Sequence, residues 1–373
     1  MKKLFELLNL RKQQDGDFGV EIECEGEALG VPNPDVWSTV DDGSLRGIFP
    51  HGRAEWVFAK PLSLHQSIKE VHQLRVFQDQ AGAKLDFSFR TSVHVHMNVQ
   101  RLTFDQYLNT VYTYLLLENV LVRYCGNERI GNRFCLRTQD AEGMSDILSQ
   151  LFKQGPAVLK GITNENAKYA SINLAATCAY GSLEFRAMQG NLEAPYISTW
   201  LRALYNLRDF AMKQGNPQNI HDLFVRCEPS EFMEMVLGDE YNSFSYEDEV
   251  NDMRQAFSIT LDLPYAYSSD DVRNKQKELE IQLREEYLRR QYDKEAENLK
   301  RQLQRQLERV RVPADDGLMA EFAAMAGAGV ERRYELFPDI GVRGKARPRK
   351  PDGVVAQYDL EDLLHVAPPA ALA

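Results

Sequence analysis

Three short segments, far apart in the chain, alternate polar and apolar residues with a period of two. They cover residues 19–25, 92–98 and 182–187. Because successive side chains of a β-strand point to opposite faces, each segment can bury its apolar residues and present polar groups on the other side. The pattern therefore predicts a sheet with an apolar core on one face and acids and histidines on the other. The outward positions hold Glu21, Glu23, Glu25, His94, His96, Asn98, Glu184 and Arg186.

This polar surface has two interpretations. Many half-buried strands simply expose a solvated face, and any one of the three segments fits that interpretation. An ordinary solvated face, however, mixes Lys, Thr, Gln and Ser, whereas these strands carry mainly carboxylates and imidazoles. Carboxylates that face one another would repel unless cations lay among them. A divalent-metal site is the interpretation that explains all three segments together.

The composition limits the classes of protein to consider. The 373 residues include 44 Lys and Arg against 55 Asp and Glu, a net charge of -11, which argues against nucleic-acid binding and membrane-surface attraction. The five cysteines show no CxxC spacing and indicate reduced thiols, as in a cytoplasmic protein. Near the N-terminus, Glu6 and Asn9 interrupt a short apolar stretch, so we expect neither a signal peptide nor a membrane span.

Local patterns place the expected elements along the chain. Mixed strands and helices, joined by irregular connections and hairpin-like turns, favour an α+β fold with a mainly antiparallel sheet over a doubly wound one. Thr103 followed by Asp105 and Gln106 is a helix start signal. Strands are expected near 18–25, 36–41, 53–59, 91–100, 167–175 and 182–188, and helices near 63–81, 103–125, 143–154, 193–214 and 245–257.

The composition changes after Pro264, which suggests a division of the chain. Residues 271–312 are highly charged, contain no Gly or Pro, and carry a narrow apolar stripe. Such a helix can dock on its own catalytic domain or form a coiled-coil contact with another chain, as in a homo-oligomer. The expected parts are an N-terminal segment at 1–16, a catalytic domain at 17–260, a long charged helix at 265–312, and a helical segment, basic linker and docking tail at 313–373.

Several motifs in a fixed order resemble the amidoligase family of the glutamine synthetase and glutamate–cysteine ligase superfamily of carboxylate–amine ligases. The resemblance covers roughly residues 17–215 and leaves 260–373 outside. One departure is Ser92, where many relatives have Gly. The motifs are Phe18–Glu23, Trp37–Leu45, Arg53–Val57, His94–His96, Tyr169–Asn173, and Leu183–Arg186 with Gly190.

The resemblance implies ATP-dependent amide-bond formation. In this superfamily a curved, mainly antiparallel sheet of glutamine-synthetase-like type, with helices on its outer face, holds two or three Mg²⁺ ions, and Mn²⁺ can replace them. The γ-phosphate passes to a substrate carboxylate, and an amine then displaces phosphate from the acyl phosphate. Carboxylate ligands, hard cations and an arginine suit this chemistry, because phosphoryl transfer needs positioning and neutralised charge.

The resemblance also implies roles for single residues. Asp42 would join the metal site or bind the incoming amine. Arg137 and Lys168 can alternatively be ordinary surface charges, and Asn173 a strand-end hydrogen bonder. The implied metal ligands are Glu21, Glu23, Glu55, His94 and Glu184; Glu184, Arg186 and Asp42 are the implied catalytic residues; His96, Arg186 and Lys168 would bind ATP; and Ser44, Arg137 and Asn173 would contact substrate.

Two other functions stay open at this point. A metal-dependent hydrolase could use the His-x-His pair with Zn²⁺ or Mn²⁺, and a structural or assembly protein could keep the ligase fold. A P-loop kinase is disfavoured because the chain has no Walker A motif. The expected ligase partners are an amine and a small-molecule, peptide or protein carboxylate, which the sequence does not identify further.

Overall fold

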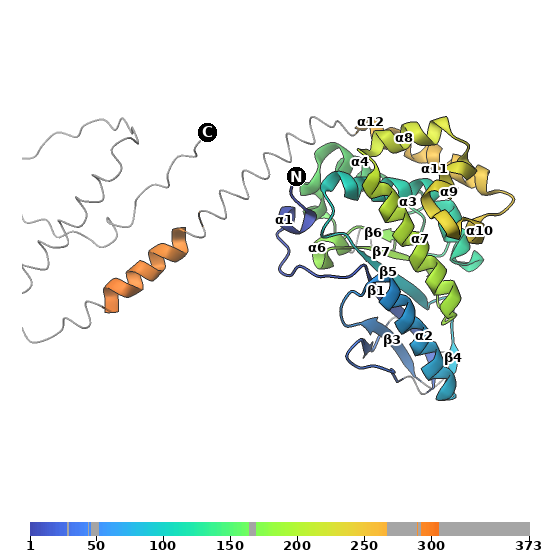
Figure 1. The fold of residues 1–373 in the computed structure, drawn as a ribbon, viewed down its shortest axis with the longest axis horizontal. Coiled ribbons are helices and arrows are strands. Elements are labelled where there is room, and N and C mark those ends of the chain that lie inside the picture. Colours follow the sequence, from blue (N-terminus) through green and yellow to red (C-terminus); the bar gives the residue numbers. More distant parts are fainter. Residues whose placement is uncertain are drawn as a thin grey trace, which may run out of the picture. The chain divides into compact units, whose positions relative to one another are not determined.

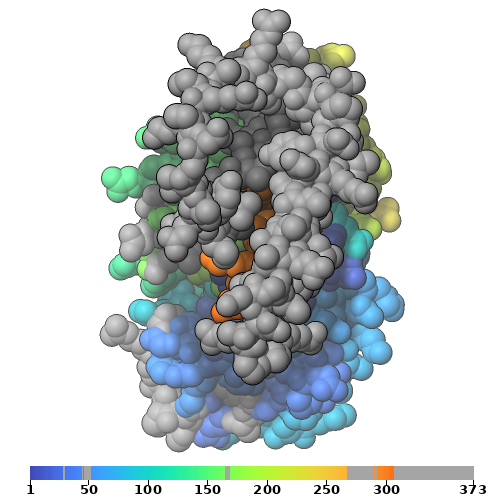
Figure 2. Space-filling model, turned by 90° about the vertical axis from the view of Figure 1, so that its left-hand side faces the viewer, coloured from blue at the N-terminus to red at the C-terminus, as the bar shows by residue number. Residues whose placement is uncertain are grey.

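The computed structural model describes residues 1–27, 30–43, 45, 52–163, 169–266, 289 and 292–305. The chain divides into two compact units, Met1–Leu283 and Arg284–Ala373. In the first unit, β3, β4 and α2 gather at one end, coloured blue, and the helices that follow β7 extend toward the other (Figures 1 and 2). No helix in the described parts of the chain is long and apolar enough to cross a membrane.

A seven-stranded antiparallel sheet forms the centre of the first unit. The strand order is β2-β3-β1-β5-β7-β6, with β4 paired to β1, and the sheet stays open at its edges (Figure 1). The expected α+β layout with a mainly antiparallel sheet is confirmed, whereas the glutamine-synthetase-like type stays a prediction. The strands are β1 (Phe18–Glu27), β2 (Trp37–Val40), β3 (Arg53–Phe58), β4 (Lys84–Asp86), β5 (Ser92–Asn98), β6 (Ile172–Asn173) and β7 (Ser182–Gln189).

Helices α2, α3 and α7 cover one face of this sheet (Figure 1). Helix α3 begins where the sequence predicts, because Thr103 and Gln106 form a reciprocal capping box that satisfies free backbone donors. The helices are α1 (Leu4–Leu7), α2 (Leu64–Gln80), α3 (Phe104–Tyr124), α4 (Met144–Gln154), α6 (Ala176–Tyr180), α7 (Ala194–Lys213), α8 (Pro217–Arg226), α9 (Pro229–Leu237), α10 (Tyr241–Phe244), α11 (Glu249–Thr260) and α12 (Asp262–Ala266), with 3₁₀ turns η1 (Asn127–Arg129), η2 (Pro156–Gly161) and η3 (Gly238–Glu240).

The core lies between these helices and the apolar face of the sheet. Phe185 of β7 contacts the rings of Tyr114 in α3 and Trp200 in α7, at centroid distances of 5.0 and 6.4 Å. Val20 of β1 and Val95 of β5 are fully buried beside this layer. Because side chains alternate along each strand, this burial fixes which residues face the opposite side.

Some elements differ from the sequence-based expectation. The strand expected at 167–175 is only Ile172–Asn173, because the chain turns into α6, while residues 164–168 lie outside the description. The helix expected at 245–257 runs Glu249–Thr260. Residues 1–16 also belong to the first unit, since Leu4 is buried and its N–H donates to Leu102 O at 2.9 Å. The other domain boundaries stay predictions.

The described residues of the second unit, 289 and 292–305, are all helical (Figure 1). They lie within the long helix expected at 265–312, and three residues of the predicted stripe, Tyr292, Leu299 and Leu303, are exposed. The remainder of that helix, the basic linker and the docking tail fall outside the described residues. Docking on its own domain and pairing with another chain both stay predictions.

Candidate metal centre and active site

Strand register places the predicted polar residues side by side on the sheet face that the core does not use. Glu21 of β1 lies opposite His94 of β5, and Glu23 lies opposite Glu55 of β3. Further across the sheet, His96 lies opposite Glu184 of β7. Four neighbouring strands therefore contribute to one polar row, and no single local segment could have built it.

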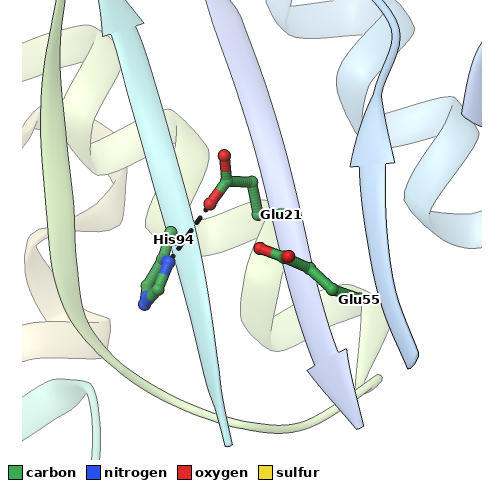
Figure 3. A group of neighbouring side chains, drawn as sticks. All are labelled: Glu21, Glu55 and His94. Carbon is green, nitrogen blue, oxygen red and sulfur yellow. Dashed lines mark hydrogen bonds and ion pairs between the residues drawn. The ribbon is translucent and has the colours of Figure 1, made fainter. Parts of the chain in front are cut away.

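Two groups of potential metal ligands share Glu21. In the first, ligand atoms of Glu21, Glu55 and His94 all lie within 4.8 Å of one another, and His94 Nδ1 is 3.2 Å from Glu21 Oε2 (Figure 3). The second group, within the same limit, comprises Glu21, His96 and Glu184, with His96 Nε2 at 3.2 Å from Glu21 Oε1. The structure thus brings four of the five predicted metal ligands into two adjoining clusters.

Glu23 reaches the first cluster through a serine that sequence reasoning did not assign. Ser92 Oγ donates to Glu23 Oε2 at 2.6 Å and lies 2.7 Å from His94 Nε2. The hydroxyl thus connects Glu23 to the Nε2 side of the His94 ring, while Nδ1 on the other side of the ring faces Glu21 Oε2. The signal was available in the sequence, because Ser92 stands two residues before His94 on the same strand face.

Glu184 is held from two sides. Asn173 Nδ2 donates to Glu184 Oε2 at 2.7 Å, and Arg186 Nη1 donates to Glu184 Oε1. Asn173 therefore positions this carboxylate, a contact that its expected substrate role did not include. Arg186 Nε is buried without a hydrogen-bond partner among the described residues, so one donor of this arginine is unsatisfied.

The carboxylates differ sharply in their proton affinity. Burial, together with the negative charges of Glu21, Glu23 and Asp42, raises the pKa of Glu55 to about 8. Burial also acts to raise the pKa of Glu21, but hydrogen bonds from His94 and His96 outweigh it and hold that pKa far below its usual range. The cluster therefore carries a proton on Glu55 near neutral pH unless a cation takes the proton's place.

The other two members of the second cluster favour their charged forms. Burial lowers the pKa of the His96 imidazole, but its hydrogen bond to Glu21 raises it more. For Glu184, burial raises the pKa of the carboxyl and the Arg186 charge lowers it, with a net lowering. When a cation displaces the protons, each cluster offers carboxylate oxygens and one neutral imidazole, a donor set that suits Mg²⁺ or Mn²⁺.

The remaining predicted site residues have different positions. Asp42 lies close enough to Glu55 to raise its pKa. Arg137 instead donates to Asp140 Oδ2 at 2.8 Å and to Asn119 Oδ1 at 3.1 Å, so its hydrogen bonds lead away from the cluster. Ser44 and Lys168 fall outside the described residues.

A cavity of about 400 Å³ opens beside the shared glutamate. Glu21, Glu55 and His96 form one side of it, and His96 is fixed there by Ser182, whose Oγ lies 3.0 Å from His96 Nδ1. The other lining groups include Lys60 and apolar residues such as Phe58. Sequence patterns did not point to Lys60, since it lies in the loop after β3 without a motif.

Comparison with known proteins indicates a class of enzyme for this site. Residues 57–207 match the model of a family described as "Putative amidoligase enzyme". The match agrees with the expected class of enzyme, a ligase. It includes the segments that hold His94, His96, Glu184 and Arg186 and excludes β1, which carries Glu21. Placement in the glutamine synthetase and glutamate–cysteine ligase superfamily stays a prediction.

No curated protein matches the chain. Among solved structures, the crystal structure of a bifunctional glutathione synthetase from Pasteurella multocida is similar over 76% of this chain and 52% of that chain, with 11% sequence identity and a TM-score of 0.35. The chain thus spans about half the length of that protein.

Proposed function

We propose that the chain is an ATP-dependent carboxylate–amine ligase that forms an amide bond through an acyl phosphate, with Mg²⁺ as its metal. The observation that carries this proposal is the pair of clusters that share Glu21, with Arg186 at the edge of the second cluster. Hard oxygen ligands beside an arginine match the needs of phosphoryl transfer, where charge on phosphate oxygens must be neutralised.

The metal ligands proposed are Glu21, Glu23, Glu55, His94 and Glu184. When bound to these carboxylates, Mg²⁺ would neutralise negative charge on the phosphate oxygens. The chain's own contribution is orientation, since Ser92 holds Glu23 and His94, and Asn173 holds Glu184. Arg186 Nε, which is buried and has no hydrogen-bond partner among the described residues, is the proposed donor to an oxygen of the transferred phosphoryl group.

The cavity of about 400 Å³ is the proposed nucleotide site. Its apolar wall, with Val57 and Phe58, suits a base, and Lys60 adds a positive charge for phosphate. His96 stands between this cavity and Glu184, in the position proposed for a phosphate contact. Lys168 is proposed to assist there.

In the proposed reaction, a substrate carboxylate oxygen attacks the γ-phosphorus of ATP, the bond to the bridging oxygen breaks, and ADP leaves. An amine nitrogen then attacks the acyl carbon, phosphate leaves, and the nitrogen loses a proton. Asp42, which lies near Glu55, is the proposed partner of the incoming amine. Ser44, Arg137 and Asn173 remain proposed substrate contacts, for a small-molecule, peptide or protein carboxylate.

The deciding experiment measures ADP release from ATP with Mg²⁺ over pairs of carboxylates and amines. Release should need both partners, and hydroxylamine should trap the acyl phosphate as a hydroxamate. Glu184→Gln and Arg186→Ala should each lower the rate by roughly two orders of magnitude or more, because each removes charge stabilisation at the transferred group. Glu142→Gln, an exposed carboxylate outside the site, is the matched control and should retain the rate.

A metal-dependent hydrolase predicts a different result. It would cleave esters or amides without ATP, and Zn²⁺ would restore activity after chelation. Zinc hydrolases usually use several imidazoles around one ion, whereas each cluster in the described residues contains a single histidine. An assembly protein that only keeps the fold would show neither ADP release nor metal-dependent stabilisation.

A further inference from the structure

Arg129 is a buried arginine whose charge has no ionic partner in the described part of the chain. Its side chain sits in η1 and the residue is 2% exposed. Nε donates to Ala187 O and Nη2 to Arg186 O, both at 2.9 Å. Both acceptors are neutral carbonyl groups. Among the described residues, no carboxylate oxygen lies within 4.0 Å of the guanidinium.

The nearby thiol does not supply the missing negative charge. Cys135 lies close to Arg129, with its Sγ 3.6 Å from Arg129 O. Burial raises the pKa of the Cys135 thiol more than the Arg129 charge lowers it, so the thiol stays neutral. Since a guanidinium does not lose its proton in proteins, the positive charge is permanent. A buried, uncompensated charge is strongly unfavourable unless an anion joins it.

Arg129 lines a second cavity, of about 230 Å³. This volume is that of several water molecules and is large enough for the carboxylate end of a small organic acid. Besides Arg129, the cavity is lined by side chains that can form hydrogen bonds, as an anion site requires. These lining residues are Ser88, Thr91, Asn132 and Gln189.

Close packing fixes the walls of this cavity. A Cβ added to Gly190 would lie 2.1 Å from Thr91 Oγ1, and one added to Gly126 would lie 2.3 Å from Gln189 Oε1. The backbones of these glycines therefore press directly against two lining side chains. Glu128 also lines the cavity, but it is exposed, so solvent screens its charge and an anion at Arg129 is not excluded.

The cavity adjoins the metal centre at one end of β5. Gln189 lies opposite Ser92 in the strand register, and Ser92 is the residue that bonds Glu23 and His94. The proposed nucleotide cavity lies at the other end of the same strand pair, where it is lined by Asn98 and Ser182. The metal ligands of β5 and β7 thus lie between two cavities, one beside Lys60 and one built around Arg129.

We propose that the cavity around Arg129 is a binding subsite for an organic carboxylate, with Arg129 as its charge partner. The identification of that carboxylate as the acid substrate of the ligase rests on the proposed function. The existence of the anion site does not, because it follows from the burial of Arg129, the cavity and the lack of a described carboxylate. Its position lets an acid approach the metal row from the side opposite the nucleotide.

The test uses the full chain in EDTA without ATP, titrated separately with acetate, succinate and L-glutamate by calorimetry. At least one of them should bind saturably. Arg129→Gln should weaken that binding tenfold or more, because it removes the charge. Arg133→Gln removes the same charge from an exposed position four residues along and should bind like the unaltered chain.

A second variant provides an independent test of the subsite if Arg129→Gln fails to fold. Asn132→Asp places a carboxylate in the cavity beside Arg129, so it should raise the melting temperature and abolish carboxylate binding. The proposal is overturned if none of the three acids binds saturably, or if Asn132→Asp binds them unchanged. Saturable binding of inorganic phosphate but of no carboxylate would overturn the assignment of ligand class.

The outcome is separable from that of the ligase assay. Carboxylate binding that depends on Arg129, without ADP release under any condition, would refute the ligase and leave the subsite standing. Conversely, an active ligase whose KM for its acid is the same in Arg129→Gln as in the unaltered chain would refute the subsite alone.

Discussion

Glu55 is the carboxylate of the site whose raised pKa most directly indicates that a cation would stabilise its charged form. It lies on β3 opposite Glu23, and burial together with the charges of Glu21, Glu23 and Asp42 raises its pKa. By contrast, Glu21 lies between two imidazoles, and its pKa falls. The same side-chain type therefore has opposite proton affinities at positions one strand apart, because the neighbours differ in charge.

The raised pKa of Glu55 predicts a pH-dependent stability. Between pH 4.5, the ordinary pKa of a glutamate, and about pH 8, the folded chain holds a proton on Glu55 that the unfolded chain has lost, so unfolding becomes easier as pH rises. In EDTA, the melting temperature of the unaltered chain should therefore fall relative to Glu55→Gln from about pH 5 to about pH 8. Thermal unfolding at a series of pH values checks this.

Added Mg²⁺ should remove most of that fall, because the cation stabilises the ionised carboxylate and binds only the folded chain. The raised pKa of His96 also lowers the stability as the pH rises, but it is present in both the unaltered chain and Glu55→Gln. The difference in melting temperature between these two proteins therefore reports on Glu55 alone. Parallel pH profiles for the two proteins, with or without Mg²⁺, would contradict the prediction.

Strand β5 is the element that organises the site. Its alternation sends Val93, Val95 and Met97 into the core and sends Ser92, His94 and His96 to the opposite face. Burial of the apolar set prevents the strand from slipping by one residue, since a slip would exchange the two faces. The positions of both histidines therefore depend on hydrophobic packing behind them.

The same alternation gives Ser92 a positioning role that can be tested. Ser92→Ala removes the hydroxyl that connects Glu23 to His94, and Ser92→Gly removes the whole side chain. Each should weaken Mn²⁺ binding roughly tenfold or more, as loss of a ligand's orienting partner does elsewhere, with little change in fold. Calorimetric titration with Mn²⁺ measures the effect.

Ser258→Ala is the matched control for that experiment. Ser258 Oγ donates to the Gln255 carbonyl within α11, a helix that contributes no residue to either ligand cluster, so Mn²⁺ affinity should be unchanged. Equal Mn²⁺ affinity in Ser92→Ala and the unaltered chain would remove Ser92 from the metal centre. A melting temperature lowered to the same degree by both substitutions would indicate only a structural role.

At the scale of the whole molecule, the ligand clusters and both cavities belong to the first compact unit. Helix α12 is part of that unit, since Leu263 and Pro264 are buried and Tyr265 Oη lies 3.3 Å from His221 Nε2. A truncation that aims to preserve the unit should therefore keep residues through Ala266. The exposed stripe of residues 292–305 contributes no ligand to either cluster.

Truncation after Ala266 should leave Mg²⁺ and ATP binding intact while it lowers the oligomeric mass measured by light scattering. The physical reason is that an exposed row of Leu and Tyr on a charged helix suits a helical partner. A truncated chain that binds no ATP but keeps its mass would show that the C-terminal residues complete the active domain. A chain with unaltered mass and binding would refute the assembly role alone.

The sequence by itself determined the faces of the strands. Because a strand has a period of two, alternation was enough to assign Glu21, Glu23, His94, His96, Glu184 and Arg186 to one polar surface. It also determined the start of α3, since a capping box is a local interaction. The short strand β4 and helices α6 and α8 were not foreseen, because packing decides such elements more than local pattern does.

Only the tertiary structure decided which residues meet across the sheet. The pairing of β1 with β3 and β5 places Glu55 and His94 beside Glu21. Arg137 instead forms hydrogen bonds with Asp140 and Asn119. Arg129 carries no motif, and its significance lies in burial and in a missing counter-charge among the described residues. Both properties depend on groups distant in sequence, which local periodicity does not encode.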